Sequence, residues 1–262
     1  LMKETGINVA RIGEFAWSCL EPEEGKIDIS FFVNVIKKLH DNGIETIMCT
    51  PTPTPPIWMS HGHPERMYVD DQGRTMSHGS RQHMCTNNEY FRQRAEIITE
   101  HIAREIGNMP GLIAWQLDNE MKCHVAECMC ETCKKLWHKW LEDRYETIEN
   151  LNEEWGAKIW SEEYLSFDQV PQPAHVPFLH NSSLSTMYRI FSREKTTEFL
   201  HEQAQIIRKY SKAPITHNSC FEFGIDNEKV FENLDFAGVD GYPAYDNYQS
   251  FLMKYDYWRN LK

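Results

Sequence analysis

The residues with the clearest chemical potential follow an apolar run in the middle of the chain. Residues 112–117 are mostly apolar and lead directly into Asp118, Asn119 and Glu120. A Glu at the end of a strand can protonate a glycosidic oxygen, and a neighbouring Asn can hold the sugar 2-hydroxyl through bonds that strengthen in an oxocarbenium-like transition state. An isolated Asn-Glu pair is more often the start of an ordinary polar loop, so its meaning depends on the surrounding elements.

A Cys-rich segment carries a second kind of chemistry. Cys128, Cys130 and Cys133 place three thiols within six residues, a spacing that can turn their sulfur atoms toward one centre. Structural zinc is bound by four ligands in a tetrahedron, so a fourth ligand must come from elsewhere in the chain. Because the sequence shows no secretion signal, its eight cysteines are not expected to form a disulfide framework. The alternative to a zinc site is a group of reduced thiols without a metal.

The elements that must position these residues alternate along the chain. Helical spacing of apolar residues predicts helices between the strands, the longest of them over 184–210. Strands that alternate with helices indicate a parallel sheet, and polar residues at every predicted strand end favour one (β/α)8 barrel domain over an open sheet. The irregular segment 57–85 is too long for a passive connection and is expected to carry function. Strands are predicted at 8–15, 45–50, 112–117, 214–218 and 236–243.

The composition narrows the range of partners. The 262 residues include 27 Lys and Arg against 39 Asp and Glu, and the formal net charge of −12 argues against nucleic acid or an acidic membrane surface. The sequence contains no apolar run that approaches the roughly 20 residues of a membrane span. Aromatic residues make up 12% of the chain, which in an acidic protein favours stacking on sugars over stacking on bases. We therefore expect a cytoplasmic protein with an oligosaccharide ligand.

Several motifs in a fixed order carry a resemblance to a known family. The run 11–18 (RIGEFAWS) is followed by 21–25 (EPEEG), by 55–58 (PPIW), by 115–120 (WQLDNE) and then by the Cys-rich segment. This order resembles glycoside hydrolase family 42 over nearly the whole chain. The resemblance implies a retaining β-galactosidase with a (β/α)8 catalytic barrel.

The resemblance also implies roles for individual residues. Glu120 would be the general acid/base, and Asn119 would be its substrate-binding neighbour. Arg81 would hydrogen-bond the galactose, and the motif formed by Asp240 and Tyr242 would border the same subsite. The candidate substrate-binding residues are therefore Arg11, Arg81, Asn119, Asp240 and Tyr242.

The fourth zinc ligand is implied by the same resemblance. In that family a Cys shortly after the Arg-containing loop joins the Cys cluster in a structural zinc site, which makes Cys85 the partner of Cys128, Cys130 and Cys133. Cys123 and His124 are substitutes for this position. The metal would tie two loops of the active face together from an insert at about residues 121–135, and it would not be the catalyst.

The second carboxylate of a retaining mechanism is not evident in the sequence. Such enzymes need two carboxyl groups about 5 to 5.5 Å apart, and in the resembling family the nucleophile ends the seventh strand. The strands of this chain resemble the second to the sixth, so we interpret residues 1–262 as a partial barrel domain. We expect the nucleophile beyond Lys262, no turnover by the chain alone, and a homotrimer at full length.

Two alternatives to a β-galactosidase remain open at this point. One keeps the barrel but changes the sugar to an α-L-arabinopyranoside or another β-glycoside. The other is a carbohydrate-binding or zinc-scaffold protein without catalysis. A strand-end Glu in adjoining sequence would separate the enzymes from the last alternative.

Overall fold

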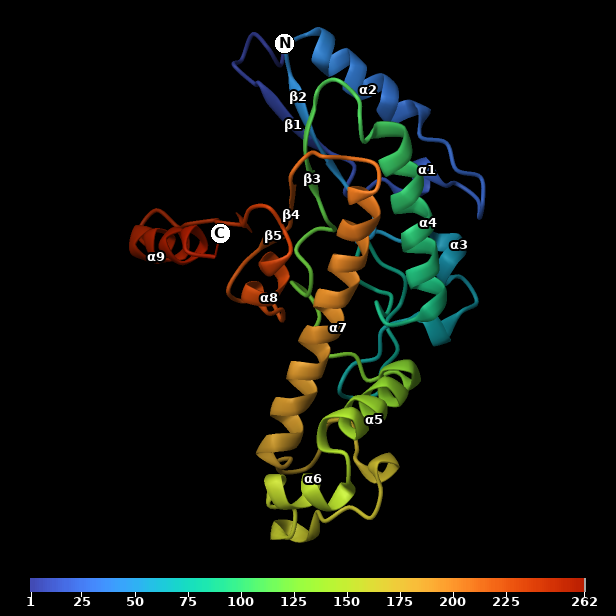
Figure 1. The fold of residues 1–262 in the computed structure, drawn as a ribbon, viewed down its shortest axis with the longest axis vertical. Helices are drawn as coiled ribbons and strands as arrows, with labels where there is room; N and C mark the ends of the chain where they lie inside the picture. Colours follow the sequence, from blue (N-terminus) through green and yellow to red (C-terminus); the bar gives the residue numbers. More distant parts are fainter. Residues whose placement is uncertain (262) are drawn as a thin grey trace.

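The structure is a computed structural model that describes residues 1–261. Its strands lie toward one end of an elongated molecule, a helical lobe forms the other end, and the longest helix runs between them (Figure 1). The chain is at the strand end for residues 1–120, passes through the helical lobe, and returns along a single long helix. The helical lobe is therefore built mainly by the segment between the third strand and that long helix.

Four parallel strands form the main sheet, and they lie in it in their order along the chain. Two further short strands pair in parallel with each other. This order is the one that successive β-loop-α units build when a barrel wall curves, and it brings the carboxyl ends of all strands to one edge. The strands are β1 (Val9–Ile12), β2 (Glu45–Cys49), β3 (Leu112–Gln116), β4 (Ile215–Thr216), β5 (Asn218–Ser219) and β6 (Gly238–Val239).

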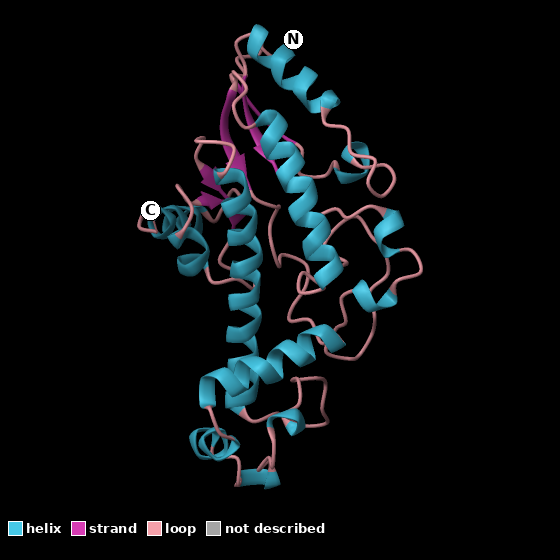
Figure 2. Cartoon of the chain, turned by 45° about the vertical axis from the view of Figure 1, so that its right-hand side comes forward, coloured by secondary structure: helices cyan, strands magenta, loops and turns pink. Residues whose placement is uncertain are grey.

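Two long helices, α4 (Glu89–Ile106) and α7 (Ser182–Arg208), pack side by side against the sheet (Figure 2). The α4 helix begins where the Asn88 side chain accepts a hydrogen bond from the Phe91 amide, and its apolar stripe enters the main core. Such a cap satisfies one of the backbone donors that a helix start leaves unpaired. The packed helices α4 and α7 therefore support the sheet whose carboxyl edge carries the polar strand ends.

The helical lobe has an aromatic core of its own. It is made by α5 (Glu131–Tyr145), α6 (Ile148–Trp155) and the first part of α7. The Trp137 ring lies at its centre, with its centroid 5.1 Å from that of Tyr188 and 5.6 Å from that of Phe191. The remaining helices are α1 (Trp17–Leu20), α2 (Ser30–Asp41), α3 (Ile57–Ser60), α8 (Asn227–Glu232), α9 (Tyr248–Arg259) and the 3-10 turns η1 (Pro64–Arg66), η2 (Ile159–Ser161) and η3 (Phe167–Gln169).

Three predicted strands are shorter than the sequence pattern indicated. The first ends at Ile12 because Gly13 has φ +104°, and a Cβ there would lie 2.8 Å from the Met48 side chain. The predicted strand 214–218 is split at His217, since β4 pairs with β3 whereas β5 pairs with β6. The strand predicted at 236–243 is reduced to β6. In these places the pairing partner, and not the local pattern, decides how long a strand is.

The described residues contain no helix that is both long enough and apolar enough to cross a lipid bilayer.

Candidate active site

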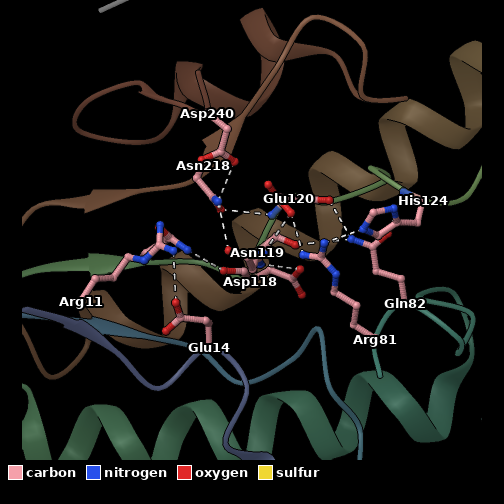
Figure 3. Close-up of polar contacts among 11 residues, drawn as sticks. Arg11, Glu14, Arg81, Gln82, Asp118, Asn119, Glu120, His124, Asn218 and Asp240 are labelled. Atoms are coloured by element: carbon pink, nitrogen blue, oxygen red, sulfur yellow. Dashed lines mark hydrogen bonds and ion pairs between the residues drawn. The ribbon is translucent and has the colours of Figure 1, made fainter. Parts of the chain in front are cut away.

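Polar side chains from five separate segments meet at the carboxyl edge of the strands (Figure 3). They surround a hollow of about 570 Å³. Most of the residues proposed from the sequence as substrate-binding groups line it, together with others that the sequence did not single out. The lining residues are Arg11, Phe15, Thr54, Ser80, Arg81, Asn119, Glu120, Asn218 and Tyr242.

Glu120 lies on a strained turn directly after β3. Both Asp118 (φ +49°) and Glu120 (φ +48°) have left-handed backbone conformations, which non-glycine residues rarely adopt without support from their surroundings. The Glu120 amide donates to Asn218 Oδ1 at 3.1 Å, and its carbonyl accepts from Gln82 Nε2 at 2.7 Å. Contacts from two distant segments therefore fix the turn that presents the carboxylate.

The Glu120 carboxylate is paired with Arg81. Arg81 Nη1 lies 2.6 Å from Glu120 Oε2, and the two side chains are 21% and 13% exposed. The other guanidinium nitrogen, Nη2, donates to His124 Nε2. The side-chain amide nitrogen of Asn119, Nδ2, makes a longer contact of 3.4 Å with the same carboxylate oxygen. One nitrogen of the Arg81 guanidinium thus orients Glu120, and the other contacts His124.

Asp118 lies beneath the hollow and is buried. Its carboxylate accepts a hydrogen bond from Thr52 Oγ1 at 2.5 Å and another from the backbone amide of Asn119 at 2.7 Å. Its own amide donates to Thr50 Oγ1 at 2.7 Å. Burial raises the pKa of Asp118 to about 6, against the opposing effect of these hydrogen bonds. Asp118 therefore supports the strained turn through its hydrogen bonds and does not line the hollow.

A second carboxyl group, Asp240, reaches Glu120 from the opposite side. Asn218 Nδ2 donates to Asp240 Oδ2 at 2.8 Å and to Asn119 Oδ1 at 3.0 Å, which links the ends of β3, β5 and β6. Burial, followed by the neighbouring charge of Glu120 and a hydrogen bond to it, raises the pKa of Asp240 to about 6. The two carboxyl groups therefore share a site, and this proximity adds to the effect of burial on the pKa of Asp240.

The other two candidates occupy the rim. Arg11 donates from Nη1 to Gln116 Oε1 at 3.0 Å and pairs with Glu14 at 3.1 Å. Tyr242 is 86% exposed and lines the hollow from the segment after β6. Neither Asn218 nor Gln82 was assigned a role from the sequence. For Asn218 the available signal was its place at the end of a predicted strand, whereas the side-chain contacts of Gln82 depend on how an irregular loop folds.

Four cysteines form a separate buried cluster. Cys85, Cys128, Cys130 and Cys133 are 1–6% exposed, and their sulfur atoms lie within 4.8 Å of one another. The Cys85 sulfur is 3.5 Å from that of Cys133 and 3.6 Å from that of Cys130. Four sulfurs bound to zinc at about 2.3 Å would be about 3.8 Å apart in a tetrahedron, so the donor set and spacing fit this metal.

The two residues considered as substitutes for the fourth ligand are not part of this cluster. Cys123 and His124 lie instead beside Glu120, with which they form a second group of potential metal ligands. The fourth position near the three clustered thiols is occupied by Cys85, as the resemblance implied. Two groups of ligand-type residues thus lie a few residues apart in the sequence but in different surroundings.

Comparison with known proteins gives consistent matches over the whole chain. The family described as beta-galactosidase, glycoside hydrolase family 42, matches residues 1–262. Beta-galactosidase YesZ of Bacillus licheniformis is 65% identical over 262 residues, and that of Bacillus subtilis is 63% identical. In both cases the alignment covers 100% of this chain and 40% of the relative. The chain thus spans about 40% of the length of the relatives it matches.

Solved structures agree with the sequence relatives. A cold-adapted beta-galactosidase from Rahnella sp. R3 superposes with a TM-score of 0.93 at 31% identity, over 100% of this chain and 39% of the other. A beta-galactosidase from a psychrophilic Marinomonas superposes with a TM-score of 0.89 at 32% identity, over 92% of this chain and 37% of the other. These neighbours have the (β/α)8 barrel fold, so the predicted fold class, an incomplete (β/α)8 barrel, is confirmed.

Proposed function

The chain belongs to glycoside hydrolase family 42, and from this premise we propose that it supplies the acid/base side of a retaining β-galactosidase active site. The observation that carries the proposal is the Glu120 carboxylate, held on a strained strand-end turn against Arg81 and facing a solvent-filled hollow. The matching sequence relatives are named beta-galactosidases. The activity is proposed for the whole protein that such a chain forms part of.

In the proposed first step, protonated Glu120 gives its proton to the glycosidic oxygen while the nucleophile carboxylate bonds to the anomeric carbon and the bond to the leaving group breaks. In the second step the Glu120 carboxylate takes a proton from the water that releases galactose. Arg81 holds the carboxylate in position through both steps, and Asp240 lies beside Glu120 at the same site. Hydrogen bonds of Asp118 to Thr52 and Thr50 hold the turn in place, so the carboxylate oxygens of Glu120 move little between the two steps.

The substrate side of the proposal uses the groups around the hollow. Donors and acceptors from β1, the 80–82 loop and the strand ends converge on one space large enough for a sugar ring. Phe15, which is 56% exposed, offers an apolar surface at the same wall. The residues proposed to hydrogen-bond the galactose are Arg11, Arg81, Asn119, Asp240 and Tyr242.

The nucleophile of the double displacement is proposed to come from outside the described residues. Asp240 lies beside Glu120 and accepts a hydrogen bond from Asn218, and Glu14 is paired with Arg11. Neither carboxylate is therefore free at the wider separation that a retaining pair requires. The chain spans about 40% of its relatives, and in our proposal the second carboxylate belongs to the part of such proteins that these residues do not cover.

We also propose that Cys85, Cys128, Cys130 and Cys133 hold a structural zinc ion. Their burial and sulfur spacing support this assignment. Bound there, zinc would supply cross-linking between the loop before α4 and the insert at about 121–135, and no chemical step passes through it. The cluster lies four residues from Arg81 and eight from Glu120 along the chain. A homotrimer and a cytoplasmic location remain predictions.

The direct test grafts residues 1–262 into the Bacillus licheniformis relative in place of its matching segment. We expect the chimera to hydrolyse a chromogenic β-galactoside, and Glu120→Gln to lower kcat by about 10²- to 10⁴-fold. Glu127→Gln is the matched control, because Glu127 is paired with Arg189 outside the hollow. Assays with an α-L-arabinopyranoside in parallel compare the sugar preferences. A folded chimera that binds galactose without turnover would favour a carbohydrate-binding protein and contradict the proposal.

A further inference from the structure

A second group of metal-ligand atoms lies beside the acid/base residue. A carboxylate oxygen of Glu120, the thiol of Cys123 and an imidazole nitrogen of His124 all lie within 4.8 Å of one another. Glu120 and Cys123 are partly buried and His124 is exposed, so the group is open to solvent. We propose that these three residues bind a thiophilic divalent cation, zinc or cadmium, and that the bound ion inhibits the enzyme.

The donor set selects the class of ion. One thiolate, one imidazole and one carboxylate suit zinc and its heavier relatives, whereas magnesium and calcium prefer sites made of oxygen atoms. Three protein ligands leave the fourth tetrahedral position open for water. This differs from the cluster of four cysteines, which offers a closed and buried set of sulfur atoms.

The segment that carries the three ligands is fixed in place. The Cys123 amide donates to the Glu120 carbonyl at 2.9 Å, which closes a tight turn between the two ligands. Gln82 fastens both ends of this turn, since its side chain accepts from the His124 amide at 3.1 Å and donates to the Glu120 carbonyl at 2.7 Å. The ligand atoms are therefore brought together by the fold, and little backbone ordering is needed when an ion binds.

Arg81 occupies the position that the ion would take. Its Nη1 contacts Glu120 Oε2, and its Nη2 contacts His124 Nε2. Figure 3 shows the guanidinium between these two side chains. The guanidinium and the ion compete for the same two ligand atoms, so binding of the ion must displace Arg81.

The displacement gives the site its effect. An ion on the Glu120 oxygen occupies the atom that must carry the proton, and the same event removes the cation that orients this carboxylate. The inhibitory effect rests on the proposed function. The binding of the ion does not, because it depends only on the three ligands and on Arg81.

Binding is tested with ¹¹³Cd²⁺ added to the purified 262-residue protein and followed by ¹¹³Cd NMR. We expect two resonances, one typical of four sulfur ligands and one at the higher field of a mixed sulfur, nitrogen and oxygen site. Cys123→Ser and His124→Ala should lose the second resonance and weaken the second binding step in calorimetry by at least roughly tenfold. Cys19→Ser is the matched control, because Cys19 is an exposed thiol apart from both ligand groups.

Arg81→Ala separates this proposal from adventitious binding to a surface thiol. Removing the competing cation should tighten the second binding step by about tenfold, because the Arg81 guanidinium no longer occupies the ligand atoms of Glu120 and His124. The proposal is overturned if the wild-type protein shows no mixed-ligand resonance. It is equally overturned if that resonance persists in Cys123→Ser or disappears in Cys19→Ser.

Inhibition is measured separately in the chimera. One further equivalent of cadmium beyond the four-cysteine site should suppress hydrolysis of the chromogenic galactoside, and Cys123→Ser should remain active under the same conditions. Suppression that is equal in both proteins would refute the inhibitory role. An inactive chimera would count against the proposed function, while the NMR experiment would still decide whether the ion binds.

Discussion

The two groups of potential metal ligands in this chain lie close together in sequence and differ in almost every physical respect. Cys128, Cys130 and Cys133, with Cys85, are buried, and the group contains no charged side chain. Glu120 and Cys123 are partly buried, His124 is exposed, and Arg81 lies among them. A buried set of four soft ligands stabilises a fold only when a cation holds it together, whereas an open set with an internal cation is already neutralised and can be used for proton transfer.

The comparison shows how one short segment can support two functions. In our proposal the insert would cross-link two loops through a metal at its far end, while the strand-end turn holds the Glu120 carboxylate. The two groups of ligands differ in burial and in the presence of Arg81 as well as in residue type, and we expect these differences to separate their roles.

Removing a ligand from the buried group should give the largest effect. We expect Cys128→Ser to lower the zinc content from about one equivalent to less than half, and to reduce the free energy of unfolding by about 4 kcal/mol, since loss of a metal is among the most destabilising changes. For a chain of this size that is about 10 °C in Tm. Metal analysis and thermal unfolding check this, with Cys19→Ser as the control. An unchanged Tm in metal-depleted protein would show that the cluster is merely a packed group of thiols.

Changing the cation of the open group should affect catalysis and leave the fold intact. A lysine at position 81 has one ammonium group and cannot donate to Glu120 and His124 in the geometry of a guanidinium. We expect Arg81→Lys in the chimera to lower kcat/KM by about 10- to 100-fold with Tm unchanged within about 2 °C. Steady-state kinetics and thermal unfolding measured on the same preparation provide the check. A large fall in Tm would mean that Arg81 is mainly structural.

Asp118, which is buried beneath the open group, should make the free energy of unfolding depend on pH. The folded pKa of Asp118 is about 6, above its ordinary value of 3.8, so the folded state retains a proton that the unfolded state has lost. The stabilisation is complete below pH 3.8 and is lost as the pH rises through 6. Between pH 4.5 and pH 7 this residue should remove about 2 kcal/mol of unfolding free energy. Urea unfolding at the two pH values should show a pH dependence that is smaller in Asp118→Asn than in the wild type by this amount, while the part that comes from the raised pKa of Asp240 remains.

The smallest effect is expected at the rim of the hollow. Tyr242 is 86% exposed, so its hydroxyl exchanges a hydrogen bond to water for one to sugar with little net gain. Tyr242→Phe in the chimera should raise KM by less than about fivefold and leave kcat unchanged. A fall in kcat instead would place this residue against the reacting bond.

Much of this architecture could be predicted from the sequence. The apolar run before Asp118 and the helical stripe of α4 follow directly from side-chain periodicity, and the polar strand ends meet because a parallel barrel wall brings them together. The split of β4 from β5 could not be predicted, because it depends on which neighbour each residue pairs with. The helix α9 was missed because its aromatic residues do not form one clear apolar face.

The site itself was only partly legible. Glu120 was singled out by its place at a strand end and Arg81 by the resemblance, but the contacts that fix them come from residues far along the chain. Asn218 reaches the Glu120 amide across 98 residues, and nothing near it in the sequence indicates this partner. The separation of Cys123 and His124 from the buried cluster was also invisible, since spacing alone does not show on which side of a turn a side chain lies.

The central claim is that Glu120 transfers the proton to the leaving group, and the dependence of rate on that group tests it most directly. In the chimera, Glu120→Ala should hydrolyse a phenyl galactoside about 10³-fold more slowly than the unmutated chimera, because its leaving group needs a proton. A dinitrophenyl galactoside, which leaves without protonation, should keep a first step close to that of the unmutated chimera. Equal losses on both substrates, or no loss on either, would contradict the assignment of Glu120 as the acid.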